Sequence, residues 1–168
     1  MKKIFASILL GLVLAGPLSA GEAIEVDGQR LELKAQARAC YLGFIELYDV
    51  DYFRGAAGPA SCVRLSYLRD IEAATLEEAT RKVFEERHGG GFVSRYRAEL
   101  ERVGKAYRSV APGDQYLYCV AADGTGSLLR DNAAVVQLAS SDFARRFLQI
   151  WVQDEDPADT PQWGFGQC

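Results

Sequence analysis

The order of apolar and polar positions in the first third of the chain predicts β-strands. Residues 31–37 alternate apolar and polar side chains, which is the period of a strand with one buried face. An Asp-Gly pair at 27–28 predicts a hairpin turn that joins them to a short strand at 24–26. Residues 41–53 are rich in aromatic and aliphatic side chains and suit one or two strands. Residues 62–68 alternate again, and we expect them to pair antiparallel with the strand before them.

The middle third predicts two helices. Thr75 and Glu78 have the spacing of a capping box, and three consecutive glycines at 89–91 should end the helix that begins there. Its apolar face is predicted to comprise Leu76, Ala79, Val83 and Phe84. The second helix should bury a stripe made of Tyr96, Leu100, Val103 and Tyr107.

The last third returns to strands and closes with a helix. Strands are predicted at 115–121, 127–129 and 135–138, separated by turns at Asp123-Gly124 and Asp131-Asn132. Ser140 or Ser141 should cap a final helix with Asp142 in its first turn. Its buried stripe is predicted to be Phe143, Phe147, Ile150 and Trp151. Strands, helices, strands and a helix predict an α+β fold, an antiparallel sheet with helices on one face and the other face solvated.

The first 20 residues have the layout of a secretory signal peptide. Lys2 and Lys3 precede an apolar run, and a small-residue boundary ends at Ala20. The run is shorter than the roughly 20 residues that cross a bilayer, and no later stretch is long enough, so we expect no membrane span. We therefore predict a signal peptide over residues 1–20 and one periplasmic or secreted domain over residues 21–168.

Charge and cysteine content narrow the possible partners and the compartment. Without Lys2 and Lys3 the formal net charge of −4 becomes −6, which disfavours nucleic acid as a partner. The four cysteines suit an oxidising compartment, so we expect at least one disulfide. The three pairings remain open at this point: Cys40, Cys62, Cys119 and Cys168.

The polar residues do not form a recognisable catalytic or metal-binding pattern. His88 is the only histidine, and its place at a predicted helix end favours a capping role over catalysis. The aspartates that follow residue 113 fall at predicted turns or a helix start, where Asp bonds locally to the backbone. We predict no catalytic residue, no metal site and no cofactor. The many tyrosines suit either a packed core or an amphipathic pocket.

Several short strings resemble the bacterial chalcone isomerase-like family, in the family's order. Residues 48–53 look like its long early strand, residues 110–116 like its proline-glycine-aspartate turn, and Asp123-Gly124-Thr125 like the next hairpin. Asp142-Phe143-Ala144, with Ile150-Trp151 behind it, is similar to the closing helix. The resemblance implies an open-faced β-sandwich with a cleft between sheet and helices.

The same resemblance implies a function. Plant enzymes of this fold cyclise chalcones, whereas non-catalytic members bind fatty acids and hold the carboxylate with an arginine and a tyrosine. Arg38 is similar in place to the arginine of the enzymes, but their catalytic threonine would fall near Leu47 or Tyr48, so cyclisation is not expected. Arg38 and Tyr48 become the candidate ligand-binding residues. Alternatively, Arg38 is a surface residue paired with Glu32 or Glu46.

We therefore expect an exported, non-enzymatic protein that binds a fatty acid or another small amphipathic ligand. An isomerase or lyase is the alternative, with a tyrosine as general acid and Arg38 stabilising an enolate or phenolate. A protein-interaction module of the cell envelope is a third hypothesis, and the sequence identifies no protein partner.

Overall fold

A computed structural model describes residues 21–56, 58–153 and 161–168, so the predicted signal peptide lies outside the described residues. The described part forms one antiparallel sheet of seven strands, in which every strand pairs with its neighbours in sequence. The strands are β1 (Ala23–Val26), β2 (Gln29–Tyr41), β3 (Ile45–Gly55), β4 (Ser61–Tyr67), β5 (Gln115–Val120), β6 (Gly126–Arg130) and β7 (Ala133–Leu138). The helices are α1 (Ala73–His88), α2 (Gly90–Arg95), α3 (Arg97–Ala106) and α4 (Ser141–Leu148).

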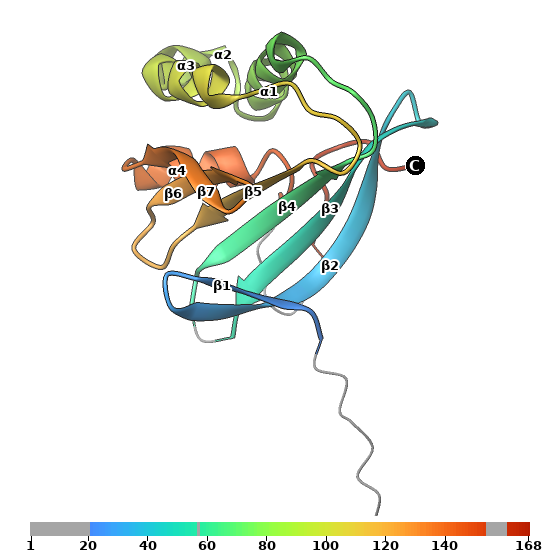
Figure 1. The fold of residues 1–168 in the computed structure, drawn as a ribbon. Coiled ribbons are helices and arrows are strands. Elements are labelled where there is room, and N and C mark those ends of the chain that lie inside the picture. Colours follow the sequence, from blue (N-terminus) through green and yellow to red (C-terminus); the bar gives the residue numbers. More distant parts are fainter. Residues whose placement is uncertain (1–20, 57, 154–160) are drawn as a thin grey trace, which may run out of the picture.

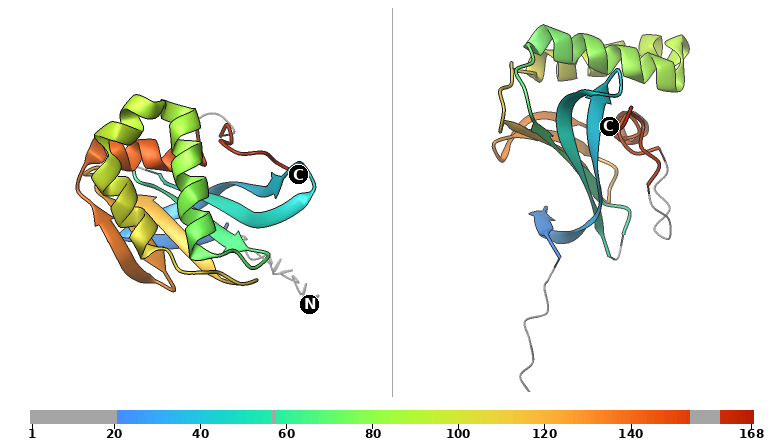
Figure 2. Two further views of the ribbon diagram at one scale, coloured as in Figure 1. Left: turned by 90° about the horizontal axis from the view of Figure 1, so that it is seen from above. Right: turned by 90° about the vertical axis from the view of Figure 1, so that its right-hand side faces the viewer.

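The helices lie on one side of the curled sheet (Figures 1 and 2). The crossover from β4 to β5 contains α1, α2 and α3, whereas α4 follows β7 and packs directly on β5, β6 and β7. The prediction of an α+β fold with helices on one face of an antiparallel sheet is therefore confirmed.

The two faces of the sheet carry different side chains. The inner face contributes buried aromatic and aliphatic residues such as Val50, Tyr52 and Tyr118 to the main core with the helices. The outer face was expected to be solvated throughout, but a second cluster that includes Leu31 and Phe53 is buried there. It is buried because β1 and the start of β2 bend out of the plane of the other strands (Figure 1).

Most predicted element boundaries are close to the observed ones, but the start of α1 is not. The helix begins at Ala73, with Glu72 as N-cap, so the predicted cap Thr75 lies inside it. The hydroxyl of Ser109 accepts a hydrogen bond from the Ala73 N–H, so a distant loop satisfies a first-turn donor in place of a local cap. The Ser140 cap of α4 is confirmed, because its hydroxyl accepts from the Phe143 N–H.

The glycine run ends α1 but does not end helical structure. Only Gly89 leaves the helical conformation, with a φ of +89°, and the next glycine begins the short helix α2. A residue with a positive φ lets the chain turn between α1 and α2. The buried stripe predicted for the second helix is confirmed, although it is divided between Tyr96 and α3.

Two disulfides are present, which confirms the prediction of at least one. Cys62 and Cys119 face each other across β4 and β5, and Cys40 on β2 is joined to the last residue, Cys168. The C-terminal segment also bonds to β2 through its backbone, because the Cys40 N–H donates to the Gly166 carbonyl at 2.9 Å. The C-terminus is thus fixed beside β2.

Candidate functional site: a cavity between α1 and the sheet

A cavity of about 970 Å³ lies between α1 and one end of the sheet. Its walls come from the ends of β2 and β3, the loop from β4 to α1, one face of α1, and the C-terminal segment 164–166. The cavity exists because α1 packs on the other helices, α2, α3 and α4, so it stands away from β2 and β3. Its volume is at the upper end of the range of about 300–1,000 Å³ that is usual for small-molecule sites.

The floor and roof of the cavity are mainly apolar. The strands contribute Ala39, Ile45 and Leu47, and α1 contributes Leu76 and Ala79. The two alanines are small, so neither fills the space between helix and sheet. An apolar chain placed here would be removed from water, which is favourable at about 0.8 kcal/mol per methylene before ordering costs.

Five charged side chains stand at the cavity, and two of them are arginines. Arg87 is half-buried, and within the described part of the chain its only hydrogen bond goes to the Gly164 carbonyl, at 2.7 Å. Arg69 is exposed and has no ion pair or hydrogen bond to any described residue. A guanidinium has five N–H donors, so both side chains keep donors for an anionic group. The three acidic residues at the cavity are Asp70, Glu72 and Glu86.

Tyr48, the predicted tyrosine of the site, lies in the cavity wall. Its ring centroid is 5.5 Å from that of Tyr67 and 6.2 Å from that of Phe165. Its hydroxyl accepts a hydrogen bond from Trp151, and burial raises the pKa of Tyr48 to about 12. Tyr48 is therefore neutral near pH 7 and can donate its own proton in a hydrogen bond.

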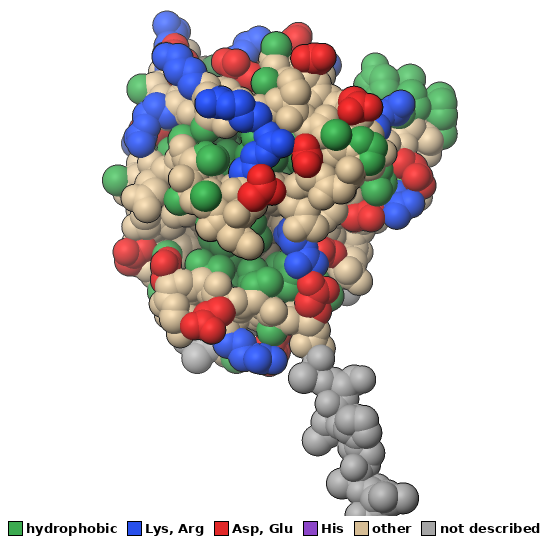
Figure 3. Space-filling view, in the orientation of Figure 1, with side chains coloured by type: hydrophobic (Ala, Val, Ile, Leu, Met, Phe, Trp, Pro, Cys, Tyr) green, Lys and Arg blue, Asp and Glu red, His purple; other side chains and the backbone are tan. Residues whose placement is uncertain are grey.

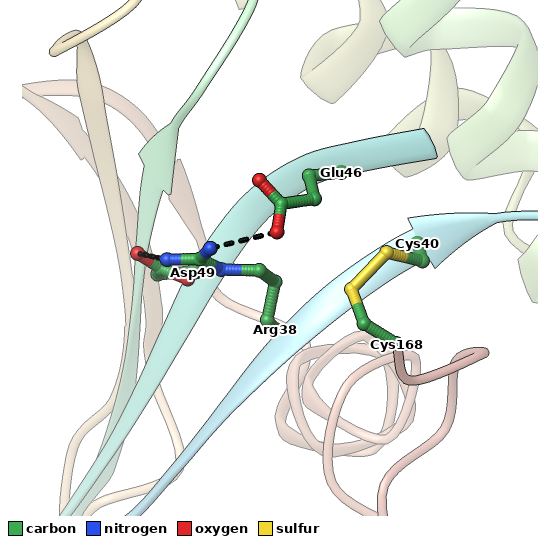
Figure 4. The surroundings of a disulfide bond; sticks show 5 residues. All are labelled: Arg38, Cys40, Glu46, Asp49 and Cys168. Carbon is green, nitrogen blue, oxygen red and sulfur yellow. Dashed lines mark hydrogen bonds and ion pairs between the residues drawn. A yellow bond between two sulfur atoms is a disulfide. The ribbon is translucent and has the colours of Figure 1, made fainter. Parts of the chain in front are cut away.

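Arg38 lies elsewhere and does not line the cavity. Its guanidinium binds the carboxylates of Asp49, at 2.6 Å, and Glu46, at 2.9 Å, on the neighbouring strand β3 (Figure 4). Those two carboxylates raise the pKa of Arg38 and accept three hydrogen bonds from its guanidinium. The expectation that Arg38 holds a ligand in the cleft is thus not supported by its position, and the pairing with Glu46 is the one that forms.

The cavity arginines were missed at the sequence level, although a signal was present. Leu76, Ala79 and Val83 were assigned to the apolar face of the first helix, and Arg87 continues that face one turn later. The sequence pattern predicts only that this face is apolar. Only the separation of α1 from the sheet shows that it borders an open cavity.

The other polar candidates have structural roles. His88 Nε2 is 2.8 Å from the Arg146 carbonyl, which links α1 to α4, and burial lowers its pKa. The carboxylates of Asp114 and Asp123 accept backbone N–H bonds from their own turns, as predicted. Among the described residues no group of three His, Cys, Asp or Glu side chains could hold a metal ion. The helices that the structure describes are all too short or too polar to cross a bilayer.

Comparison with known proteins shows similarity to solved structures and to one protein family. A fatty-acid binding protein of Arabidopsis thaliana has a similar structure, with a TM-score of 0.59 at 11% sequence identity, over 80% of this chain and 90% of the plant protein. No curated protein matches the sequence. At this identity the structural similarity establishes the fold alone. Residues 19–161 match the family model described as chalcone isomerase-like, so the chain belongs to the chalcone isomerase-like family.

Proposed function

We propose that this protein is an exported, non-enzymatic member of its family that binds a fatty acid or a similar amphipathic carboxylate. The observation that carries the proposal is the cavity under α1, which combines an apolar wall with two arginines that have free donors. The structural similarity to a plant fatty-acid binding protein supports it.

In the proposed complex the acyl chain lies between α1 and the ends of β2 and β3, and the carboxylate meets Arg87. A carboxylate taken out of water requires a paired cation, and a guanidinium can bind it through two N–H groups at once. Arg87 suits this role because the Gly164 carbonyl already fixes one of its amino groups at the cavity wall. Arg69, on the loop before α1, supplies a second positive charge.

Binding is favoured over catalysis by the state of the tyrosines. Burial raises the pKa values of Tyr48, Tyr67, Tyr107 and Tyr118. A phenol with a raised pKa is a weaker proton donor near pH 7, where general acids work best with a pKa near the ambient pH. The hydroxyls of Tyr107 and Tyr118 are also hydrogen-bonded inside the core, to Thr80 and to the Ala144 carbonyl.

Export to the periplasm or the medium is part of the proposal. It is supported by the leader-like first 20 residues and by two disulfides, which persist mainly in oxidising compartments. N-terminal sequencing of the processed protein should begin at Gly21. Recovery of the intact chain from the cytoplasm alone would contradict export.

Calorimetry with saturated and unsaturated fatty acids of 10 to 18 carbons tests the binding function. We expect saturable binding of one ligand per chain. Arg87→Ala should weaken binding by about tenfold or more, which corresponds to about 1.4 kcal/mol or more.

The matched control for Arg87→Ala is Arg81→Ala on the same helix. Arg81 is exposed, lies 4.0 Å from Glu85 and does not line the cavity, so its removal should leave affinity within twofold. Absence of binding to the unaltered protein, or equal losses in both variants, would overturn the proposal.

A further inference from the structure

The tip of the β2–β3 hairpin is an exposed apolar projection. Tyr41, Leu42 and Phe44 are 59%, 68% and 73% exposed, and the only other exposed large hydrophobic residue in the described chain is Val135, at 40%. The tip projects from the body of the molecule at the upper right of Figures 1 and 3, where hydrophobic side chains gather. We refer to residues 41–44 as the hairpin tip.

The backbone of the hairpin tip disfavours the leucine it contains. Leu42 and Gly43 have φ angles of +54° and +78°, and the Phe44 N–H bonds to the Tyr41 carbonyl, as in a tight turn with two left-handed residues. A β-carbon crowds the carbonyl oxygen in this conformation, so glycine, asparagine and aspartate are preferred.

Two other hairpin turns in the same chain follow that preference. Asp27-Gly28 has φ angles of +51° and +73°, and Asp131-Asn132 has +51° and +64°. Only the hairpin tip places a large apolar residue there. The positive φ of Leu42 and the exposure of its side chain to water are both unfavourable in free energy. Burial within the folded chain does not offset them, because the side chain is exposed.

The hairpin tip adjoins the cavity. Tyr41 belongs to both, since it is exposed at the tip and lines the cavity together with Cys40 and Ile45 on either side of the turn. An apolar surface therefore runs from the projecting tip into the space under α1. Residues 41–45 contain no charged side chain, and the next charges, Arg38 and Glu46, are paired with each other.

We propose that the hairpin tip inserts into the surface of a lipid bilayer and places the cavity mouth against it, so that an acyl ligand passes between bilayer and cavity. The passage of ligand rests on the proposed function, whereas the insertion does not. Tyrosine, phenylalanine and leucine are the residue types that insert at the interface of head groups and acyl chains.

A bilayer fits this surface better than a protein partner does. A stable protein interface buries about 800 Å² per partner, from roughly 20–30 residues on each side. The hairpin tip consists of four residues and is too small for such an interface. Lipid is fluid and accepts a narrow apolar projection without a matched surface. The acidic net charge of the chain also favours uncharged lipid, because anionic lipid would repel it.

Flotation of the processed protein with phosphatidylcholine vesicles tests the inference. The test variant is Leu42→Asn with Phe44→Ser, which removes two apolar side chains and places a favoured residue at the left-handed position, so the fold should be retained. We expect the unaltered protein to float with vesicles and the double variant to lose at least tenfold in partitioning. The control Val135→Ser removes an exposed apolar side chain on β7 and should change partitioning by less than twofold.

Calorimetry without vesicles separates this inference from the proposed function. Neither Leu42 nor Phe44 lines the cavity, so the double variant should bind fatty acids as the unaltered protein does. Failure of the unaltered protein to bind vesicles, or equal flotation of the double variant, would overturn the insertion even if fatty acids bind in solution. A dimer of the unaltered protein that the double variant abolishes would also overturn it, and would identify the tip as a contact between copies.

Discussion

The side chains of Arg38 and Ala39 lie on opposite faces of β2, although the two residues are adjacent in sequence. Ala39 pairs with Tyr48 of β3 and lines the cavity. Arg38 pairs with Asp49 of β3 and donates hydrogen bonds to its carboxylate. A strand reverses its side chains at every residue, so one position separates a cavity residue from a surface ion pair. Arg38 therefore does not line the cavity that Ala39 borders.

We therefore predict that Arg38→Ala leaves fatty-acid affinity unchanged. The substitution breaks two exposed ion pairs, which contribute about 0–1 kcal/mol each to stability. Calorimetry should give affinities within twofold of the unaltered protein, and urea unfolding should show a free-energy loss of about 1 kcal/mol or less. A large loss of affinity in a fully folded Arg38→Ala variant would contradict this prediction and indicate that the ligand binds on the outer face of the sheet, beside Arg38.

Buried tyrosines make the fold sensitive to alkali. Tyr48 has its pKa raised to about 12 by burial, and Tyr67, Tyr107 and Tyr118 are also raised above the ordinary value of 10.0. Below pH 10 these hydroxyls are protonated in both the folded and the unfolded state, so their full contribution to the free energy of unfolding is present. Above pH 10 the unfolded chain loses the protons first, so each tyrosine lowers the free energy of unfolding by about 1.4 kcal/mol per pH unit.

Urea unfolding at pH 8, 9.5 and 10.5 measures this effect. We expect equal stability at the first two values and a clear loss at the third. Phenolate absorbance should rise at a higher pH in the native protein than in the protein unfolded in urea. Coincident titration curves with no loss of stability by pH 10.5 would contradict the burial of these hydroxyls.

At the scale of elements, the C-terminal segment acts as a wall of the cavity. It contributes Gly164, Phe165 and Gly166 to the lining and is held to β2 by backbone bonds and by the disulfide of its last residue. The other disulfide joins two central strands that already pair with each other. The first disulfide therefore holds the cavity wall in place, and the second joins two strands of the sheet.

Cys168→Ser should impair ligand binding more than loss of the central disulfide does. Both losses should destabilise the protein by about 2–5 kcal/mol. Only the first frees the segment that carries Gly164 and Phe165, so fatty-acid affinity should fall several-fold, and protease should cut near the C-terminus sooner. The comparison is with Cys62→Ala/Cys119→Ala, measured by calorimetry well below the unfolding temperature. Equal affinity in the two variants would show that the segment needs no covalent tie.

At the scale of the whole molecule, the cavity results from how the layers are spaced. The helix α4 packs closely on β5, β6 and β7. The helix α1 instead packs on the other helices and lies across the cavity from β2 and β3. One half of the sheet therefore has a filled core and the other half an open space. A ligand in that space would complete the packing between α1 and the strands.

Ligand should accordingly raise the thermal stability of the whole domain. A ligand that binds only the folded state at 100 times its dissociation constant adds about 2.7 kcal/mol. For a domain of this size that corresponds to a rise in Tm of roughly 5–10 °C. Calorimetric scans with and without fatty acid measure it, and Arg87→Ala should lose most of the rise at the same ligand concentration. A rise that is equal in both proteins would place the ligand outside the cavity.

The sequence by itself determined the elements and their order. Alternation of apolar residues marked the strands, Asp-Gly pairs marked two hairpins, and helical stripes marked the apolar faces of the helices. These features are local, since side-chain period and turn chemistry depend on residues a few positions apart. The family resemblance added the correct fold, which the matched family model and the structural relative confirm.

Only the tertiary structure decided where the cavity lies and which residues line it. The distance between α1 and β3, the choice of disulfide partners and the return of the C-terminus to β2 join residues more than 25 positions apart. A stripe of Leu76, Val83 and Arg87 has the same sequence pattern whether it meets a packed sheet or an open cavity. Long-range packing sets that difference, so only the folded chain shows that Arg87 lines the cavity and that Arg38, named from the family resemblance, does not.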